Sequence, residues 1–441
     1  MNALDRLAFA IAAATKEVDP VRVGGRVTQV TPSAIRVSGL SKMVCLGDLV
    51  TLSGKTGERR GEIIRLDEQD VMVKPFEPHA DIGIGARAYR KGALTVHPHV
   101  SWKGRVVDAL GQPADNLGPL HNGPQAVPLD GEPPQMLERG RVRKPVRTGV
   151  KVIDLFTPLC VGQRVGVFAG SGVGKSTLLA MLAGSDDFDT VVVGLVGERG
   201  REVREFVEDV LGKALERSVV VVATGDESAM MRRLAPRTAM SVAEYFRGLG
   251  DSVLLIIDSA TRFAHAARDV SMAAGEPPVA RGYTPSVFSD LTRLLERAGP
   301  GPEGEGAITG IFSVLVDGDD HNDPVADTTR GVLDGHIVLD RAIADAGRYP
   351  AVNVLGSVSR LSQHAWSAEE RELIMRLKAM ISRYEDTRDL RLMGGYQPGS
   401  DAGLDKACQL VPKIYEFLRQ DAQSRQVGDP FTELARALSQ N

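Results

Sequence analysis

Residues 169–176 read AGSGVGKS, with three glycines before a lysine-serine pair. Glycines let backbone amides turn toward an anion, and the helix-forming residues that follow would add the positive end of a helix dipole. The stretch follows an apolar run and matches the phosphate-loop motif, with alanine in place of its first glycine. We therefore expect a nucleotide to contact Gly170, Ser171, Gly172, Val173, Gly174, Lys175, Ser176 and Thr177.

Lys175 and Ser176 close this motif with two side chains that suit a nucleotide and its metal. Lys175 would reach the β- and γ-phosphates, and the Ser176 hydroxyl would bind Mg²⁺. A second metal-side group is Asp258, which ends the apolar run VLLIID. Alone it is a weak signal, because strands often end in Asp for reasons of turn geometry. Beside a phosphate loop it is a strong one, so ATP and Mg²⁺ are the expected ligands.

Glu198 follows another apolar run, in the stretch LVGERGRE, with Arg199 next to it. A carboxylate at that position could orient and polarise a water for in-line attack on the γ-phosphate. The alternative is that Glu198 simply begins a helix and that Arg199 is a surface arginine.

Four nearly unbroken apolar runs must position these side chains. They are RVGVF, TVVVGLV, VVVVA and VLLIID. Such runs are typical of strands covered on both faces, and the amphipathic stretch over residues 201–217 predicts one helix between the second and third. Alternating strands and helices predict an α/β fold with a parallel sheet, which binds ligands at the carboxyl ends of its strands. The phosphate loop, Glu198 and Asp258 all fall at that edge.

The segments before and after these alternating strands and helices have different sequence patterns. Residues 24–89 hold short β-like runs between frequent turns, which predict a small antiparallel barrel. Near the C-terminus, Ser367 and Glu370 form a capping-box pattern before an apolar helix face, so a helical domain is expected. That face consists of Leu373, Leu377, Met380, Ile381 and Tyr384.

The chain therefore divides into four predicted segments. They are an N-terminal helical arm (1–22), a β-barrel domain (23–95), a parallel-sheet phosphate-loop domain (96–362) and a C-terminal helical domain (363–441). In the arm, apolar residues repeat at helical spacing, so this helix either packs on its own domain or binds a partner. These residues are Leu4, Leu7, Ala8 and Ile11.

Composition excludes several classes of protein. The 441 residues are 43% hydrophobic and carry a net charge of −4, so bulk charge predicts no docking on nucleic acid or an anionic membrane. Cys45, Cys160 and Cys408 are few and far apart, which favours free thiols in a reducing compartment. No run is long and apolar enough to span a bilayer, and no secretory leader is recognisable. We expect a cytoplasmic protein.

Several longer stretches resemble the rotary ATP synthase catalytic-subunit superfamily, and within it the flagellar and type III secretion export ATPases. They are residues 138–179, 197–206, 254–270, 275–299 and 349–361. The similarity covers most of residues 104–415, and GGYQPGSDAGLDKA (394–407) resembles the export branch. The chain lacks the acidic helix-loop that the synthase β subunit uses against its rotor. The resemblance implies a RecA-like central domain.

Transferred position by position, the resemblance implies roles for single residues. Lys175 and Ser176 take the phosphate-loop roles, and Asp258 takes the metal side. Glu198 is the carboxylate that polarises water, with Arg199 beside it.

Two further residues gain a role only from the resemblance. Tyr349 falls where the family stacks an aromatic ring on adenine, and Arg360, in SVSR, falls where an arginine finger reaches a neighbouring subunit's site. Without the family, Tyr349 would be read as a core residue and Arg360 as a surface one. Because one chain carries both Glu198 and this arginine, each copy could complete its neighbour's site. We expect a homo-oligomeric ring, a hexamer.

The function implied is an ATPase that energises flagellar protein export at the inner face of the membrane, with possible peripheral membrane association. Expected partners are a central stalk protein, export chaperones, membrane proteins of the export gate, and a regulator or stator protein on the N-terminal arm. Alternatives are the same motor in a virulence secretion system, a synthase β subunit, or a ring-shaped RNA helicase of the transcription-terminator type. The helicase would need a basic or aromatic surface, which 5% aromatic residues and a negative net charge do not favour.

Overall fold

The computed structural model describes residues 22–77, 81–316, 323–421 and 428–439, together with Leu4, Leu7 and Ser424. Two compact units share the chain. The smaller contains the described residues up to Leu94 and the segment Val270–Glu276, and the larger contains Thr95–Asp269 and the described residues from Pro277 onward. The arm expected over residues 1–22 lies almost entirely outside the described residues, and the predicted domain boundaries stay predictions.

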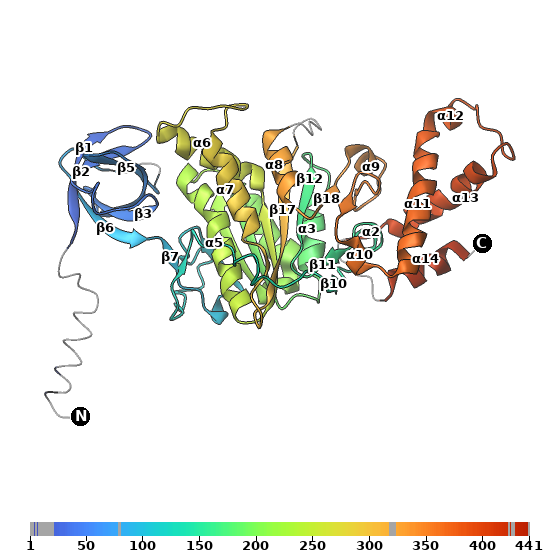
Figure 1. Cartoon of the computed structure of the whole chain (residues 1–441), viewed down its shortest axis with the longest axis horizontal. Helices are drawn as coiled ribbons and strands as arrows, with labels where there is room; N and C mark the ends of the chain where they lie inside the picture. Colours follow the sequence, from blue (N-terminus) through green and yellow to red (C-terminus); the bar gives the residue numbers. More distant parts are fainter. Residues whose placement is uncertain are drawn as a thin grey trace. The chain divides into compact units, whose positions relative to one another are not determined.

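The smaller unit is a closed barrel with strand order β1-β2-β5-β4-β3-β6 (Figure 1). Its strands are β1 (Gly24–Val30), β2 (Ile35–Ser38), β3 (Asp48–Ser53), β4 (Glu58–Leu66), β5 (Asp70–Pro75) and β6 (Arg87–Ala93). Alternation forms the core: Ile35 and Val37 point inward on β2, and Val71 and Val73 do so on β5. The barrel expected over residues 24–89 is confirmed.

The larger unit is built on a nine-stranded sheet. In spatial order its strands are β19 (Val358–Ser359), β18 (Gly335–Val338), β12 (Arg164–Ala169), β17 (Ala307–Leu315), β15 (Ser252–Asp258), β13 (Thr190–Glu198), β14 (Ser218–Thr224) and β8 (Arg105–Asp108). β16 (Gly299–Pro300) pairs with β17, and β16 and β19 run antiparallel to their neighbours. The other pairings in the sheet are parallel, so the carboxyl ends of β12, β13 and β15 lie at one edge.

Helices cover this sheet (Figure 1). The longer ones are α3 (Lys175–Ala183), α5 (Ala229–Gly248), α7 (Pro285–Glu296) and α8 (Pro324–Val332), whereas α6 (Ala260–Ala273) begins in the larger unit and ends in the smaller one. α5 packs on β13, β14 and β15, and α3 contributes leucines to the core beside the valines of β12. The remaining short elements are β7 (Thr95–Val96), η1 (Val100–Trp102), β9 (Val127–Pro128), β10 (Pro145–Val146), α2 (Lys151–Phe156), β11 (Leu159–Cys160), α9 (Arg341–Asp345) and α10 (Ser362–Ala365). The predicted α/β architecture is confirmed.

The single helix predicted over residues 201–217 is wrong. The segment forms α4 (Gly200–Glu205), a π-helical stretch η2 (Phe206–Leu211) and a 3₁₀ stretch η3 (Gly212–Arg217). Gly212 has φ of +48°, a conformation that breaks the helical path and that glycine adopts at low cost. Phe206 and Leu211 still bury their side chains, so the apolar pattern survives the break.

The C-terminal part of the larger unit is helical, as expected. Its helices are α11 (Ala368–Asp386), α12 (Arg388–Leu392), α13 (Ala402–Leu418) and α14 (Pro430–Ser439). The capping box of Ser367 and Glu370 starts α11. The buried face of α11 consists of Ile374, Leu377 and Ile381, whereas Leu373 is 41% exposed, so the predicted face was wrong at that residue. Within the described residues, no helix is long and apolar enough to cross a membrane.

Candidate active site

The phosphate loop joins the buried strand β12 to helix α3. Gly172 and Gly174 have φ of +77° and +88°, in the left-handed region that favours glycine. Val173 is 2% exposed and anchors the loop in the hydrophobic core, while Ser171, Ser176 and Thr177 are exposed. The first turn of α3 has no acidic residue, so its positive dipole end is not neutralised by its own side chains. The loop is therefore shaped to receive an anion.

Lys175 and Asp258 meet at the carboxyl edge of the sheet. The Lys175 ammonium donates to Asp258 Oδ1, which also accepts a hydrogen bond of 2.7 Å from the Ser313 hydroxyl on β17. The side chain of Asp258 is 4% exposed. A buried carboxylate needs such partners, and these two fix its orientation.

Glu198 ends β13 and opens on the same space. Together with Ser176 and Asp258 it lines a cavity of about 150 Å³. Residues from the phosphate loop and from two strand ends therefore converge around one small volume, as the strand pattern predicts.

The carboxyl group of Glu198 has an unusual protonation equilibrium. Burial, the neighbouring Asp258 carboxylate and a hydrogen bond with Glu202 raise the pKa of Glu198 to about 7, although Lys175 and Arg262 oppose the rise. Arg262 Nε lies 3.7 Å from Glu198 Oε1. A carboxyl group that titrates near neutral pH is suited to exchange a proton with a bound water.

The same cavity has donors suited to Mg²⁺. The residues available are the Ser176 hydroxyl and the Asp258 carboxylate, both oxygen donors. Among the described residues, no group of three or more His, Cys, Asp or Glu side chains is arranged to hold a metal by itself. The two oxygen donors alone suit Mg²⁺, which is usually held by one or two protein groups, substrate phosphates and water.

Tyr349 lies against the phosphate loop. Its ring is 3.3 Å from the position that a Cβ on Gly174 would occupy, and the side chain is 44% exposed. Its carbonyl accepts a hydrogen bond of 2.9 Å from the backbone of Gln420, which follows α13. An open aromatic face beside the loop could stack on a nucleotide base.

The two predicted arginines lie apart from this cavity. The Arg199 side chain is 85% exposed and pairs with Glu202 at 3.2 Å, so it does not line the cavity. Arg360 follows β19 and is exposed, and its guanidinium donates to the Arg330 carbonyl at 3.4 Å. Their predicted catalytic roles stay predictions.

Three neighbours of the site escaped prediction from the sequence. Ser313 holds Asp258, Arg262 faces Glu198, and Arg341 on α9 donates to the Ser171 carbonyl of the phosphate loop at 3.1 Å. Arg341 lies three residues beyond the end of β18, in the stretch VLDR, which is a weaker signal than that of Asp258, the last residue of its strand.

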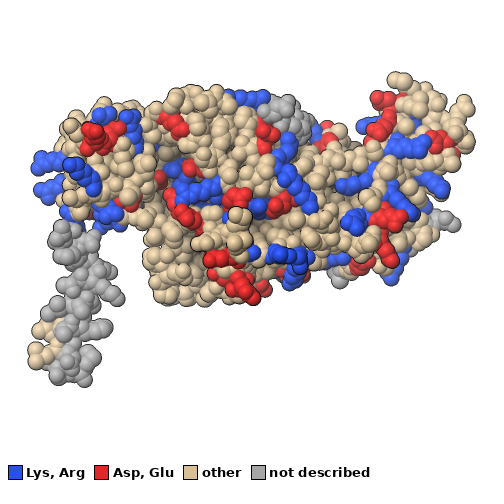
Figure 2. Space-filling view, viewed as in Figure 1, with Lys and Arg blue, Asp and Glu red and all other residues tan. Residues whose placement is uncertain are grey.

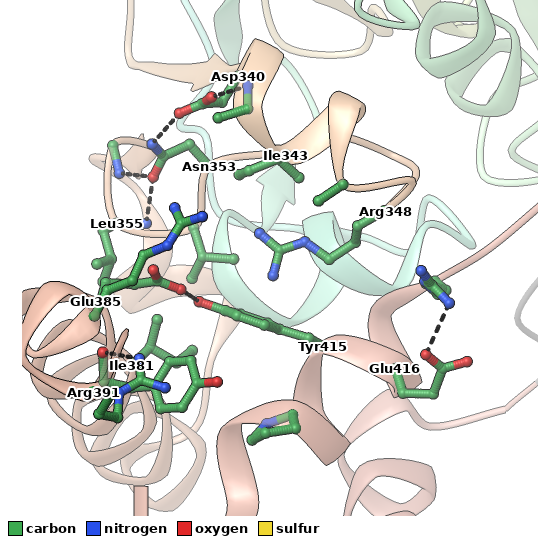
Figure 3. Close-up of a pocket in the computed structure, with 18 of the residues that line it drawn as sticks. Asp340, Ile343, Arg348, Asn353, Leu355, Ile381, Glu385, Arg391, Tyr415 and Glu416 are labelled. Atoms are coloured by element: carbon green, nitrogen blue, oxygen red, sulfur yellow. Dashed lines mark hydrogen bonds and ion pairs between the residues drawn. The ribbon is translucent and has the colours of Figure 1, made fainter. Parts of the chain in front are cut away.

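A larger cavity, of about 850 Å³, lies between the segment 340–356 and helices α11–α13 (Figure 3). Several of its charged groups already have partners: the Arg348 guanidinium lies 3.7 Å from the Tyr415 ring centroid, Tyr415 donates to Glu385, and Arg419 pairs with Glu416. It contains none of the phosphate-loop residues. We therefore assign the chemistry to the smaller cavity.

Comparisons with known proteins agree with this geometry. Residues 149–359 match the nucleotide-binding domain of the ATP synthase alpha/beta family, and residues 366–440 match the T3SS EscN ATPase C-terminal domain. The flagellum-specific ATP synthase of Rhizobium meliloti (strain 1021) is 57% identical over 415 residues, covering 94% of this chain and 89% of the relative. The type 3 secretion system ATPase of Xanthomonas euvesicatoria is 38% identical over 431 residues, covering 96% of each chain.

Solved structures extend the similarity to three dimensions. The assembled ATPase EscN from the type III secretion system of enteropathogenic E. coli has a TM-score of 0.88 at 37% identity, covering 94% of this chain and all of that one. EscN in complex with its central stalk EscO has a TM-score of 0.85 at 36% identity, covering 94% and 98%. The resemblance stated from the motifs is confirmed. The chain belongs to the ATP synthase alpha/beta family, in the branch of the flagellar and type III secretion ATPases.

Proposed function

We propose that this protein is a Mg²⁺-dependent ATPase that hydrolyses ATP to ADP and phosphate and energises flagellar protein export. The observation that carries the hydrolytic proposal is the convergence of Ser176, Glu198 and Asp258 around one cavity at the carboxyl ends of parallel strands, with Lys175 bonded to Asp258.

The proposed roles follow from the chemistry of each group. The loop amides and Lys175 bind the phosphates, and Ser176 with Asp258 would hold Mg²⁺, which supplies charge neutralisation at the phosphate oxygens. Glu198, in its ionised form, orients the attacking water and accepts its proton as the water oxygen bonds to the γ-phosphorus and the bond from this phosphorus to the β–γ bridging oxygen breaks, which releases ADP. A pKa of about 7 suits this role, because the carboxyl can ionise at neutral pH and then take up a proton. Tyr349 stacks on the adenine ring.

Arg360 is proposed to act on the site of a neighbouring copy. Ser359 pairs with Gly335 at the amino end of β18, whereas the phosphate loop follows the carboxyl end of β12, so roughly one strand length separates Arg360 from its own loop. β19 is the edge strand of the sheet, and Arg360 is exposed there. Each copy could thus supply its own phosphate loop to one site and Arg360 to the site of its neighbour. This supports a homo-oligomeric ring, which we propose to be a hexamer. The assembled state of EscN supports the same view.

The similarity favours a flagellar role. Identity is 57% to a flagellum-specific ATP synthase and 38% to a type 3 secretion system ATPase, although EscN makes a virulence secretion system the alternative. The match to the EscN C-terminal domain separates the chain from a synthase β subunit. By analogy with the EscN complex, a central stalk protein is a proposed partner.

We further propose a location in the cytoplasm at the inner face of the export apparatus, and contacts with export chaperones, the export gate and a regulator on the N-terminal arm. Nucleic acid is not a proposed partner. Figure 2 supports this, because basic and acidic side chains are interspersed on the visible face of the larger unit rather than gathered in a basic stripe.

Two experiments test the proposal. Purified protein should hydrolyse ATP only with Mg²⁺, and Lys175→Ala should abolish turnover; a Lys175→Ala protein with full turnover would remove the proposed site. Deleting the gene should abolish flagella, whereas normal flagella with lost effector secretion would assign the protein to a virulence system.

A further inference from the structure

We propose that Arg164 and Asp334 are positioning residues that hold Arg360 in the geometry needed to reach a neighbouring copy's nucleotide. The inference rests on the proposed function of Arg360 as an arginine finger. Arg164 begins β12 and Asp334 directly precedes β18, so the pair lies at the amino ends of these strands, opposite the end that carries the chain's own phosphate loop.

Asp334 connects directly to the finger. Its backbone carbonyl accepts a hydrogen bond of 2.9 Å from the Arg360 backbone amide. Its carboxylate accepts hydrogen bonds from the Arg164 backbone amide at 3.0 Å and from Arg164 Nε at 3.3 Å. The residue to which Arg360 is bonded is therefore fixed to the first residue of β12, a central strand of the sheet.

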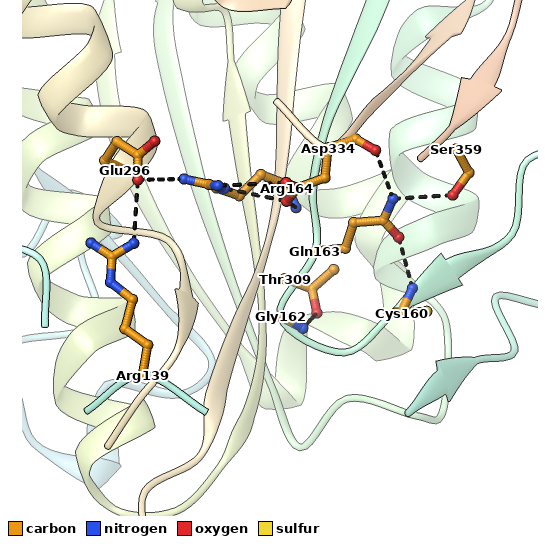
Figure 4. A network of polar contacts seen from close by, with 9 residues as sticks. All are labelled: Arg139, Cys160, Gly162, Gln163, Arg164, Glu296, Thr309, Asp334 and Ser359. Carbon is orange, nitrogen blue, oxygen red and sulfur yellow. Dashed lines mark hydrogen bonds and ion pairs between the residues drawn. The ribbon is translucent and has the colours of Figure 1, made fainter. Parts of the chain in front are cut away.

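A buried amide fixes the residue that precedes the finger (Figure 4). Gln163 is fully buried, and its Nε2 donates to the Asp334 carbonyl at 3.3 Å and to Ser359 Oγ at 3.1 Å. The Ser359 hydroxyl donates in turn to the Pro158 carbonyl at 2.8 Å. The Gln163 amide thus binds both Asp334 and Ser359. A displacement of Asp334 would therefore also displace Ser359, the residue directly before Arg360.

Arg164 is held from its other side. Its guanidinium contacts Glu296, the last residue of α7, at 2.6 Å, and Glu296 also contacts Arg139 at 3.3 Å (Figure 4). The Arg164 side chain is 16% exposed and that of Asp334 is 27% exposed. A largely buried arginine with two carboxylate partners has little freedom to move, which is what a finger support requires.

The chain offers a matched pair without a finger. Arg105 is the first residue of β8, at the opposite edge of the sheet, and it donates to Asp115 at 2.7 and 2.9 Å. Asp115 also accepts from the Val106 backbone amide, so its chemistry resembles that of Asp334. If such pairs served only to fix the first residue of a strand, Asp115→Ala and Asp334→Ala would change kcat to a similar extent.

The expected cost is that of a misplaced catalytic group. Removing the Asp334 carboxylate frees Arg164 and loosens the support of Arg360, and a displacement of about 1 Å can cost roughly 10²-fold in rate. Asp334→Ala should therefore lower kcat of the assembled protein by roughly 10- to 100-fold, with the KM for ATP within about twofold of wild type. Asp115→Ala should leave kcat of the assembled fraction unchanged.

Mixed rings distinguish positioning from a merely structural role. A mixed ring combines Asp334→Ala subunits, which keep the phosphate loop with Lys175, and Lys175→Ala subunits, which keep the supported Arg360. At some interfaces the intact phosphate loop of an Asp334→Ala subunit therefore meets the intact arginine finger of a Lys175→Ala subunit. An equimolar mixture should recover up to about a quarter of wild-type turnover, because that arrangement occurs at about one interface in four of a randomly mixed ring. Arg360→Ala mixed with Lys175→Ala should recover turnover in the same way.

Each outcome has one meaning. If the Arg360→Ala mixture recovers turnover and the Asp334→Ala mixture does not, the positioning role is overturned while the finger stands. If neither mixture recovers turnover, the finger itself falls, and the proposal falls with it. Should Asp334→Ala fail to assemble, Asp334→Asn takes its place, because its side-chain carbonyl can still accept from the Arg164 backbone amide and only the negative charge is removed.

Discussion

Replacing Glu198 with glutamine should stabilise the protein at neutral and alkaline pH while it removes most hydrolysis. The pKa of Glu198 is raised from 4.5 to about 7, chiefly by burial and then by the Asp258 carboxylate. Between these pH values the folded protein keeps a proton that the unfolded chain releases. The free energy of unfolding contributed by Glu198 therefore falls as pH rises from 4.5 to 7, and the full penalty is present above pH 7.

The size of this penalty follows from the raised pKa. At 1.36 kcal/mol per pH unit it would reach about 3 kcal/mol, and solvent screening at a cavity wall reduces this to roughly 1–2 kcal/mol. Glutamine resembles the neutral acid and cannot ionise. We expect Glu198→Gln to gain roughly 1–2 kcal/mol over wild type at pH 8 and nearly nothing at pH 4.5.

Urea unfolding of both proteins without nucleotide, at pH values from 4.5 to 8, measures this difference. Glu208→Gln, at a side chain that is 57% exposed and pairs with Arg204, is the control, and it should show no such gain. Glu198→Gln should still bind ATP with about wild-type affinity, because its phosphate loop is intact. The wild-type kcat/KM for ATP should rise with pH through about 7, because kcat/KM reports ionisation of the nucleotide-free protein, in which Glu198 titrates there. If the free energy of unfolding of Glu198→Gln stayed equal to that of wild type as pH rises, the raised pKa assigned to Glu198 would be refuted.

Three other substitutions test the remaining groups. Arg360→Ala should keep ATP binding but lower the steady-state turnover of assembled protein by about 10³-fold or more, and turnover that still rises normally on assembly would refute the finger. Gly174→Ala would put an alanine in a backbone conformation with φ of +88°, and its Cβ would lie 3.3 Å from the Tyr349 ring. Titration with a fluorescent ATP analogue should therefore show about tenfold weaker binding. Unchanged binding would mean that the phosphate loop does not need this backbone conformation. Arg341→Ala removes the donor to Ser171 and should raise the KM for ATP by about three- to tenfold at constant kcat; a fall in kcat alone would argue against a loop-holding role.

The sequence predicted those parts of the site that depend on strand ends. A phosphate loop, Glu198 and Asp258 follow uninterrupted apolar runs, and parallel strands bring such ends to one edge. Ser313 was missed because it lies within β17 rather than at its end, and no motif marks it. Arg341 was missed because only the tertiary fold brings α9 to the phosphate loop.

The helices show where local pattern is insufficient. Apolar spacing over residues 201–217 is correct for burial, yet Gly212 breaks the backbone, which spacing alone does not register. In α11 a one-residue offset separates the buried Ile374 from the exposed Leu373, because the partner helix α13, not the pattern, selects the face. The network of Arg164, Asp334 and Arg360 joins distant segments and has no signature in the sequence.

The most direct test of a site shared between two copies is the ATPase rate per chain as a function of protein concentration, with the particle mass measured on the same samples. Turnover per chain should rise with the fraction of assembled protein and be close to zero where the chain is monomeric. Full turnover by monomers at the lowest concentration would contradict the proposal that Arg360 of one copy completes the site of the next.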